Sequence, residues 1–227
     1  RLLGLKVVFT HHGPDYNREK WSWIAKTVLK LGERIGTRHA HEVIVISKVI
    51  QDKLVEKYNR QDTHLIFNGY SKPVIIDQTA YLDSLGLLPR KYIFTLGRIV
   101  EEKAFDLLIR AFSRIQDTDY QLVIAGDADH NTAYSQQLKK LARENDVVLT
   151  GFIKGEKLQE LFSHAGLFVL PSSHEGLPIS LLEAMSYKLP VFVSDIPANA
   201  QGALHRKTFF ISGDEEALLD KLKKKLG

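Results

Sequence analysis

Short apolar runs of four to six residues recur along the chain, separated by segments whose apolar residues return every three or four positions. The runs are typical of buried strands, and the periodic segments are typical of amphipathic helices. The runs predict strands at residues 5–10, 43–46, 64–67, 92–96, 120–125, 147–150, 166–170, 190–194 and 208–211. The periodic segments predict helices near residues 21–38, 47–58, 77–85, 104–115, 132–144, 156–164, 178–187, 197–205 and 215–226.

This alternation predicts an α/β protein with mainly parallel sheets that are covered by helices on both faces. Residues 91–227 supply enough strands for a complete Rossmann-like domain. Residues 1–71 supply few strands and look like the latter part of a second Rossmann-like domain. Residues 72–90, which contain two prolines and one short helical segment, are expected to connect the two domains.

Composition narrows the function classes only slightly. The chain has 227 residues, no cysteine and 44% hydrophobic residues, which is ample for packed cores and excludes disulfide or thiolate chemistry. No apolar run approaches the ~18 residues that a membrane-spanning helix needs. The net charge of +4 favours anionic partners such as nucleotides or acidic lipid surfaces without choosing among them.

The predicted helix at residues 21–38 carries two stripes. Ile24, Val28, Leu31 and Ile35 form an apolar stripe, and Lys26, Lys30, Arg34 and Arg38 form a basic stripe beside it. We favour an ordinary amphipathic helix with a solvated basic face. The alternative is a helix that lies on an anionic membrane, helped by Trp21 and Trp23.

Short segments that contain glycine follow four of the predicted strands. They are Gly97-Arg98, Gly126-Asp127, Gly151-Phe152 and the segment 172–176. Because ligands of parallel α/β sheets bind at the carboxyl ends of the strands, we expect these segments to collect on one rim. Arg98 and Lys103 are five residues apart across a strand-to-helix turn, so both can face that rim and bind a diphosphate. The alternative is a pair of ordinary surface cations.

The segment 171–187 combines a strand end, a tight loop and the start of a helix. Pro178 suits the first turn of that helix. The backbone N–H groups and the positive helix end should attract phosphate at the rim. Glu175 lies in the loop and Glu183 lies eight residues later, inside a largely apolar helix. From the local pattern alone, Glu183 either reaches solvent or meets hydrogen-bond donors, since an unpaired buried carboxylate is costly.

The run Glu-Gly-Leu-Pro-Ile-Ser-Leu-Leu-Glu at 175–183 resembles the Glu-x7-Glu motif of the retaining GT-B glycosyltransferases of family 4. That family also tends to place Gly-Arg, and a lysine about five residues later, after an earlier strand. Gly97-Arg98 and Lys103 stand there, and the resemblance covers nearly the whole chain. One departure is Ala104, since the family usually has glycine after this lysine.

The resemblance implies a role for each matching position. Arg98 and Lys103 would hold the donor diphosphate beside Gly97, Glu183 the ribose hydroxyls and Glu175 the donor sugar. Phe152 and Ile153 would line the base, and the amides of Gly176 and Leu177 would cradle phosphate or sugar. His12 would aid catalysis, with His11 as a substitute. His12-Gly13 with Arg18 and Lys20-Trp21 further resembles a bacterial rhamnosyltransferase-like subgroup.

The implied activity is transfer of a sugar from a nucleotide-diphosphate donor to an acceptor hydroxyl of a surface polysaccharide or glycolipid, with retention. The expected partners are the nucleotide sugar and a glycan or lipid-linked acceptor, with peripheral membrane contact and no nucleic acid. We expect no metal and no further cofactor. The expected location is the cytoplasm, at the inner face of the plasma membrane.

The alternative function is a non-catalytic nucleotide-sugar-binding module or fragment. Other classes fit less well. The chain lacks the Gly-x-Gly-x-x-Gly of nicotinamide and flavin enzymes and the Gly-x-x-x-x-Gly-Lys of nucleotide triphosphatases. His11-His12 and His39-x-His41 have no third ligand at a spacing typical of zinc sites.

Overall fold

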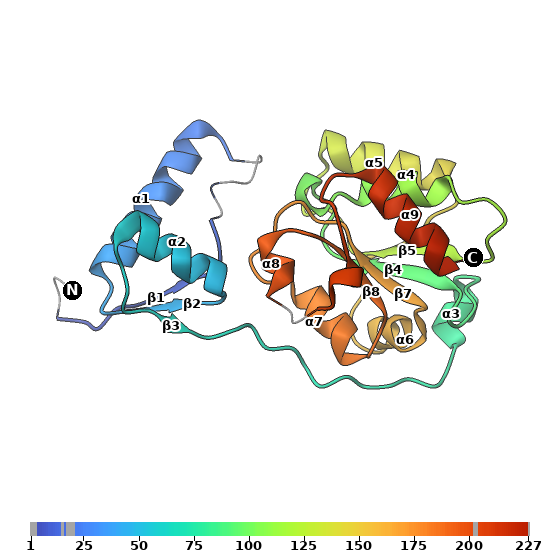
Figure 1. Ribbon diagram of the computed structural model, residues 1–227, viewed down its shortest axis with the longest axis horizontal. Helices are drawn as coiled ribbons and strands as arrows, with labels where there is room; N and C mark the ends of the chain where they lie inside the picture. The colour runs from blue at the N-terminus through green and yellow to red at the C-terminus, as the bar shows by residue number, and fades with distance from the viewer. Residues whose placement is uncertain (1–3, 15, 17–20, 202–203, 227) are drawn as a thin grey trace. The chain divides into compact units, whose positions relative to one another are not determined.

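The computed structural model describes residues 4–14, 16, 21–201 and 204–226. The chain divides into two compact units, each built from parallel strands and helices (Figure 1). The first unit comprises residues 1–69 with the short segments 175–178 and 197–202. The second unit comprises residues 70–174, 179–196 and 203–227. Arg18 and Lys20, part of the subgroup resemblance, lie outside the described residues.

The first unit contains a three-stranded parallel sheet in the order β1-β2-β3. Its main elements are β1 (Val8–His11), α1 (Trp23–His39), β2 (Glu42–Val45), α2 (Lys48–Tyr58) and β3 (His64–Leu65). Side-chain hydroxyls cap both helices: Ser22 accepts the Ala25 N–H, and Ser47 accepts the Ile50 N–H. The cap at Ser22 explains why α1 begins at Trp23 and not at Trp21.

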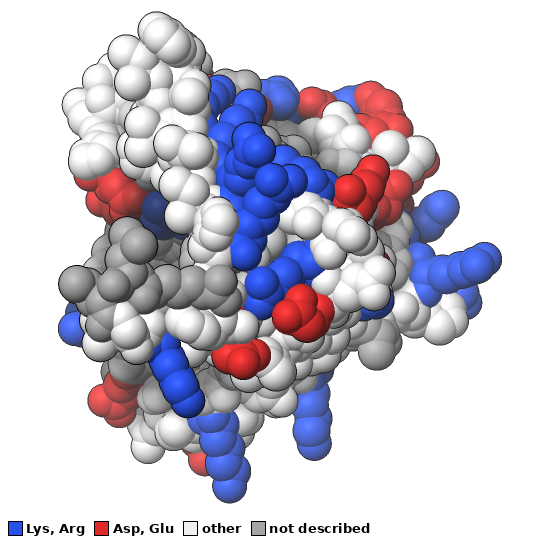
Figure 2. Space-filling model, turned by 90° about the vertical axis from the view of Figure 1, so that its left-hand side faces the viewer, with Lys and Arg blue, Asp and Glu red and all other residues white. Residues whose placement is uncertain are grey.

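Helix α1 is rotated differently from an ordinary amphipathic helix. Its buried residues are Glu33 and Thr37, which are polar. The apolar stripe that the sequence indicates lies at the surface, with Leu31 and Ile35 more than half exposed. The basic residues Lys30, Arg34 and Arg38 are exposed, as the favoured interpretation expects, but the apolar stripe is exposed as well. Figure 2 shows lysine and arginine side chains gathered beside an uncharged ridge on one face of the molecule.

A buried carboxylate holds the elements of the first unit together. Glu33 of α1 accepts hydrogen bonds from four side chains of other elements. They are His11 of β1 at 2.9 Å, Tyr16 at 3.3 Å, and Lys57 and Tyr58 of α2 at 2.7 and 2.6 Å. Burial alone would raise the pKa of Glu33, but hydrogen bonds from His11, Lys57 and Tyr58 outweigh it and lower the pKa to about 2. The ionised carboxylate is thus strongly preferred in the folded unit.

The second unit contains a six-stranded, all-parallel sheet in the order β6-β5-β4-β7-β8-β9. Its strands are β4 (Tyr92–Leu96), β5 (Gln121–Ala125), β6 (Val148–Gly151), β7 (Leu167–Leu170), β8 (Val191–Ser194) and β9 (Phe209–Phe210). Its helices are α3 (Ala80–Ser84), α4 (Phe105–Ser113), α5 (Ala133–Glu144), α6 (Glu156–His164), α7 (Ile179–Ser186) and α9 (Glu215–Leu226). This strand order is that of a doubly wound Rossmann fold. The predicted fold class is therefore confirmed.

Helices cover both faces of this sheet, with α4, α5 and α9 on one side and α3, α6 and α7 on the other (Figure 1). Side chains alternate along β4, so that Ile93 belongs to the first core and Phe94 to the second. Both are completely buried. The segment predicted as a helix at 197–205 forms only the short α8 (Pro197–Ala200).

Residues 70–79 run in extended form along the second unit before α3 begins. The Tyr187 hydroxyl accepts from the Val74 N–H at 3.3 Å and donates to its carbonyl at 3.1 Å. The buried Glu160 carboxylate accepts the Leu82 N–H at 2.8 Å, near the start of α3. The connecting segment is thus attached to the helical layer that contains α6 and α7.

The turn between β4 and α4 contains an unusual backbone conformation. A short 3₁₀ turn (Glu101–Lys103) precedes α4, and Ala104 adopts the left-handed region with φ 48° and ψ 39°. A residue with a Cβ atom is disfavoured there, whereas glycine is not. The position that departs from the family pattern is therefore one where glycine is physically preferred.

Replacing Glu33 by glutamine should loosen the first unit, because Lys57 and His11 would lose their buried anionic partner. We expect the opening free energy of α1 and α2 amides to fall by about 3–5 kcal/mol. Hydrogen exchange of the full chain at pH 7 would measure this loss, and amides of α4 and α9 should not change.

The exposed Glu56 of α2 offers a matched control, since Glu56→Gln should leave exchange unaltered. Because the folded-state pKa of Glu33 is lowered from 4.5 to about 2, its contribution is present above pH 4.5 and is lost as pH falls towards 2. The difference between wild type and Glu33→Gln should therefore shrink at pH 3. Equal protection of α1 in both proteins at pH 7 would contradict the assigned role.

Replacing Ala104 by glycine should stabilise the second unit. Glycine removes the cost of the left-handed conformation, which adds about 1–2 kcal/mol to the free energy of unfolding. Glycine also makes the unfolded chain more flexible, which reduces this gain by about 0.4–1 kcal/mol. Thermal unfolding should show a net gain of about 0.5–1 kcal/mol. Ala133→Gly, at the start of α5, is the control and should lower stability; a loss at position 104 as well would show that the conformation carries no strain.

Candidate active site

The strand order of the second unit creates a crevice at one place. The chain leaves β4 towards β5 on one side, whereas β7 lies on the other side of β4. Loops after β4 and β7 therefore diverge, and ligands of doubly wound sheets bind at such a switch point. The segments 97–103 and 171–173, both singled out from the sequence, follow these two strands.

Backbone hydrogen bonds join the loops along this rim. The Gly97 N–H donates to Ala125 at 3.0 Å, and the Gly126 N–H donates to Gly151 at 2.8 Å. On the other side of the crevice, the Ser173 N–H donates to the Glu102 carbonyl at 2.9 Å. The expected convergence of the strand ends is therefore present, and it involves main-chain contacts.

Two glycines allow this close approach. A Cβ atom on Gly126, which has φ 119°, would lie 2.0 Å from the Gly97 carbonyl oxygen. A Cβ atom on Gly97 would lie 3.2 Å from Cε of Lys103. The stem of Lys103 thus lies against the backbone at the end of β4, and it keeps its ammonium group near the rim.

Arg98 makes a contact that the sequence did not predict. Its guanidinium pairs with the Asp129 carboxylate at 2.7 Å, and both side chains are partly exposed. Asp129 stands just beyond the end of β5, the strand next to β4, and this adjacency is the signal that could have identified it. An anion that binds Arg98 must therefore share it with, or displace, this carboxylate.

Glu183 lies half-buried in the middle of α7. Among the residues that the structure describes, its carboxylate has no hydrogen-bond or ion-pair partner. Burial raises the pKa of this carboxyl above its usual value. Such a group is suited to accept hydrogen bonds from ligand hydroxyls, which would replace the water it has lost.

The loop after β6 presents one aromatic residue. Phe152 is 76% exposed. This exposure is unusual, because an aromatic side chain that is buried removes a large apolar area from water. Ile153 instead packs partly against the core that contains α6 and α7. Of the two residues proposed to line a base, Phe152 is therefore the one available to stack on a ligand.

The two adjacent histidines at the end of β1, His11 and His12, differ in burial. His11 is buried, its Nε2 contacts Glu33 at 2.9 Å, and its Nδ1 accepts the Gly13 N–H at 3.1 Å. Both ring nitrogens are thus engaged, which leaves His11 unsuited to contact a ligand. His12 is exposed and lines a pocket of about 380 Å³ whose wall also contains Tyr16 and Val28.

The predicted residues thus fall into two groups. Gly97, Arg98, Lys103, Phe152, Ile153 and Glu183 belong to the second unit. His12, Glu175, Gly176 and Leu177 belong to the first. Glu175 and Gly176 are half-buried.

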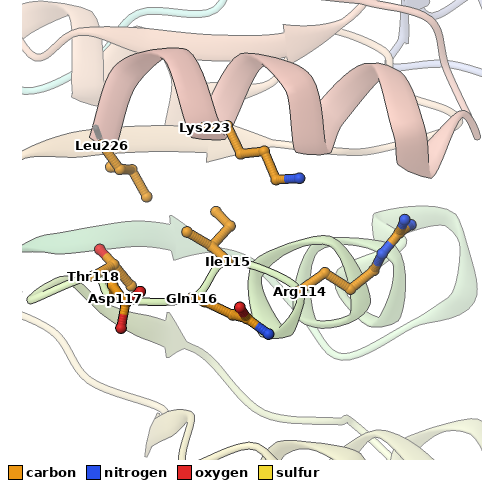
Figure 3. Close-up of a pocket in the computed structure, with 7 residues that line it drawn as sticks. All are labelled: Arg114, Ile115, Gln116, Asp117, Thr118, Lys223 and Leu226. Carbon is orange, nitrogen blue, oxygen red and sulfur yellow. The ribbon is translucent and has the colours of Figure 1, made fainter.

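A second hollow of about 350 Å³ lies at the opposite ends of the strands. Figure 3 shows Lys223 and Leu226 of α9 pointing towards the segment after α4, from which Ile115 points back. This segment leads into the amino end of β5. The nearby Arg114 is bound to Glu216. This hollow is therefore separate from the rim.

The described part of the chain contains neither a cluster of metal ligands nor a helix that could span a membrane. No group of three or more histidine or acidic side chains there could hold a metal ion. None of its helices has the length and apolar character required to cross a membrane.

Comparisons with known proteins agree with this geometry. The family "Glycosyl transferases group 1" matches residues 77–226, and "Glycosyltransferase Family 4" matches residues 1–71. A 2-deoxystreptamine N-acetyl-D-glucosaminyltransferase of Niallia circulans is 26% identical over 88% of this chain and 54% of its own. An O-antigen chain mannosyltransferase of Salmonella typhimurium is 23% identical over 86% of this chain and 53% of its own. The chain thus spans about half the length of these relatives.

Among solved structures, Anabaena HepE in complex with UDP-glucose superimposes with a TM-score of 0.80 and 19% identity, covering 96% of this chain and 61% of that one. Sucrose-phosphate synthase of Thermosynechococcus elongatus gives a TM-score of 0.80 and 21% identity, covering 97% and 58%. At these identities the likeness shows the fold, whereas the family matches cover most of the sequence. The chain therefore belongs to glycosyltransferase family 4, the retaining enzymes of the GT-B fold.

Proposed function

We propose that this chain is the donor-binding portion of a glycosyltransferase that moves a sugar from a nucleotide diphosphate to an acceptor hydroxyl, with retention of configuration. The observation that carries the proposal is the position of both cations after β4, beside the switch point of the second sheet: the stem of Lys103 lies against Gly97, and Arg98 pairs with Asp129. Two cations on a rim of converging loops suit a pyrophosphate better than a neutral ligand.

Each part of the donor has a partner in the second unit. Arg98 and Lys103 bind the diphosphate beside the backbone of Gly97, and Glu183 accepts hydrogen bonds from the ribose. Phe152 stacks on the base, and Ile153 supports the loop that carries it. The titles of the HepE structures name UDP and UDP-glucose as ligands of that protein. A uridine diphosphate sugar is therefore the donor that we propose to test first.

The catalytic roles follow from charge. As the sugar departs, negative charge grows on the leaving diphosphate, and Arg98 and Lys103 stabilise it there. We assign His12, whose ring is exposed, to the acceptor side of the reaction and Glu175 to the donor sugar. The amides of Gly176 and Leu177 complete the set as donors to phosphate or sugar.

The proposed acceptor is a hydroxyl of a surface polysaccharide or glycolipid. One relative is an O-antigen chain mannosyltransferase, and this name supports a glycan acceptor. A lipid-linked glycan would place the protein in the cytoplasm, in peripheral contact with the inner face of the plasma membrane. A relationship to the bacterial rhamnosyltransferase-like subgroup is also proposed, from the resemblance of His12-Gly13 with Arg18 and Lys20-Trp21.

The second candidate is a module that binds nucleotide sugar without turnover. It is favoured by the location of Arg98, Lys103 and Glu183, which all belong to the second unit. Both candidates require the same donor site, so binding alone does not separate them. Turnover does, because only an enzyme releases sugar from the bound donor.

Arg98→Ala and Lys103→Ala should each weaken binding of UDP by about 10–100-fold, because each removes a charge-assisted hydrogen bond worth about 1.5–3 kcal/mol. Isothermal titration calorimetry of the full chain would measure this. GDP-, ADP- and dTDP-sugars in a parallel thermal-shift screen would identify the preferred base, since a ligand at ~100 times its dissociation constant adds about 2.7 kcal/mol of apparent stability.

Arg143→Ala provides the control, since this exposed cation lies in the last turn of α5, far along the chain from either loop of the crevice. Unchanged UDP affinity in both rim variants would reject the phosphate assignment. With UDP-glucose bound, release of glucose that His12→Ala abolishes at unchanged UDP affinity would support the enzyme. Binding without hydrolysis or transfer would support the module.

Glu183→Gln should have opposite effects on stability and on binding. Burial raises the pKa of the wild-type Glu183 carboxyl, so its charged form is disfavoured in the folded protein. The free-energy cost of keeping this charge buried therefore grows as pH rises above 4.5 through the folded-state pKa. The ligand-free variant should therefore melt at a higher temperature than wild type at pH 7 and at the same temperature below pH 4. It should also bind UDP about tenfold more weakly, because an amide is a poorer acceptor for hydroxyls.

Glu56→Gln, at an exposed position of α2, should change neither quantity. A variant at position 183 that loses stability at pH 7 but keeps its affinity for UDP would show that Glu183 serves the fold alone.

A further inference from the structure

The loop after β5 places a carboxylate against one of the two cations proposed to bind phosphate. Asp129 pairs with the Arg98 guanidinium at 2.7 Å, although the two residues are 31 positions apart in the chain. Their side chains are 50% and 41% exposed, so a ligand can reach both groups. An exposed ion pair adds little to stability. The place of this pair at the rim is therefore more informative than its strength.

Hydrogen bonds of the same loop keep Asp129 close to Arg98. The Ile99 N–H, directly after Arg98, donates to the Asp127 carbonyl at 3.0 Å. The Asp127 carboxylate in turn pairs with Lys139 of α5 at 2.7 Å. A capping box then fixes the start of α5 a few residues later. The loop is thus attached on both sides of Asp129, and its carboxylate is positioned at the rim in advance of any ligand.

A matching ion pair lies at the other ends of the same two strands. Lys91 stands directly before β4, Asp119 stands two positions before β5, and their charged groups are 2.7 Å apart. Because β4 and β5 are parallel, this pair lies at the sheet edge opposite the rim. Two pairs that only tied β4 to β5 would be equivalent. They differ in place, since only the pair of Arg98 lies beside the switch point, where ligands of such sheets bind.

The cations of the rim would meet two different anions during one turnover of the proposed reaction. In the donor, one oxygen of the outer phosphate is esterified to the sugar. In the product that oxygen is free, and a terminal phosphate loses a second proton near pH 6, so the product carries about one more negative charge at pH 7. Arg98 and Lys103 alone would therefore hold the product more tightly than the donor, which would slow its release.

We propose that Asp129 is a specificity-determining residue that favours the nucleotide-sugar donor over the nucleoside diphosphate product, an inference that rests on the proposed function. Its carboxylate repels the additional charge of the product and returns to Arg98 as the product leaves. The donor carries less charge on its outer phosphate and meets less repulsion. Asp129 thus eases product release and weakens donor binding to a smaller extent.

The affinities of UDP and UDP-glucose for wild type and Asp129→Asn test this proposal. Asp129→Asn should bind UDP about three- to fivefold more tightly, which is the range expected for loss of one exposed charge. The same variant should bind UDP-glucose less than about twofold more tightly. Isothermal titration calorimetry of the full chain at pH 7.5 and low salt, without acceptor, would measure both. Where the thermal-shift screen prefers another base, its diphosphate and sugar diphosphate take the place of these two ligands.

Two further variants serve as controls. Asp119→Asn removes an ion pair of equal length from the opposite ends of β4 and β5, so it should change neither affinity. Asp129→Glu keeps the negative charge and should retain the wild-type ratio of the two affinities. Raising the salt concentration should reduce the difference between Asp129→Asn and wild type, because the repulsion of exposed charges is screened.

Three results would overturn the proposal, and they separate it from the proposed function. Binding of UDP to wild type with unchanged or weaker binding to Asp129→Asn would reject the role of Asp129 and leave the donor site intact. An equal gain for UDP and UDP-glucose would show that Asp129 does not distinguish product from donor. Absence of binding of every nucleoside diphosphate to wild type and variant alike would reject the proposed function, and the role of Asp129 with it.

Discussion

Main-chain hydrogen bonds between loops are the constraint on which the proposed donor site depends. The carboxyl ends of β4, β5 and β6 are joined through Gly97, Gly126 and Gly151, and the loop after β7 is attached to the turn before α4 through Ser173. These contacts do not involve the side chains that we assign to the ligand. Substitution of Arg98, Lys103 or Glu183 would therefore leave this main-chain framework intact. This independence is how one fold can serve many donors.

The sequence was sufficient for the architecture because both units obey simple patterns. Apolar runs such as that of β4 are buried on both faces, so their type was unambiguous. The side of helix α1 that turns inward could not be predicted from the sequence, for a physical reason. Its inward side is held by Glu33, whose partners His11, Lys57 and Tyr58 are up to 25 positions away, and periodicity reports only which residues share a face.

The same distinction between local sequence patterns and contacts made by distant residues applies to the candidate site. Motif spacing singled out Arg98, Lys103 and Glu183, and their roles stay a proposal; Arg98 and Lys103 follow β4, and Glu183 lies in α7. It could not identify Asp129 as the partner of Arg98, since that contact depends on the course of the loop after β5. The resemblance favoured His12 over His11. The burial of His11, whose Nδ1 accepts the Gly13 N–H, supports that preference, and burial of a single side chain is a tertiary property.

The Arg98–Asp129 pair has a consequence for which anions the rim admits. An exposed pair of this kind is worth at most about 1 kcal/mol, so it competes only weakly. A monovalent anion that reaches Arg98 alone gains little over the carboxylate already present. In the proposed donor site, a diphosphate that spans Arg98 and Lys103 would gain a second contact and displace the carboxylate. The Asp129 carboxylate would thus act as a weak internal competitor that favours two linked phosphates over a single anion such as chloride.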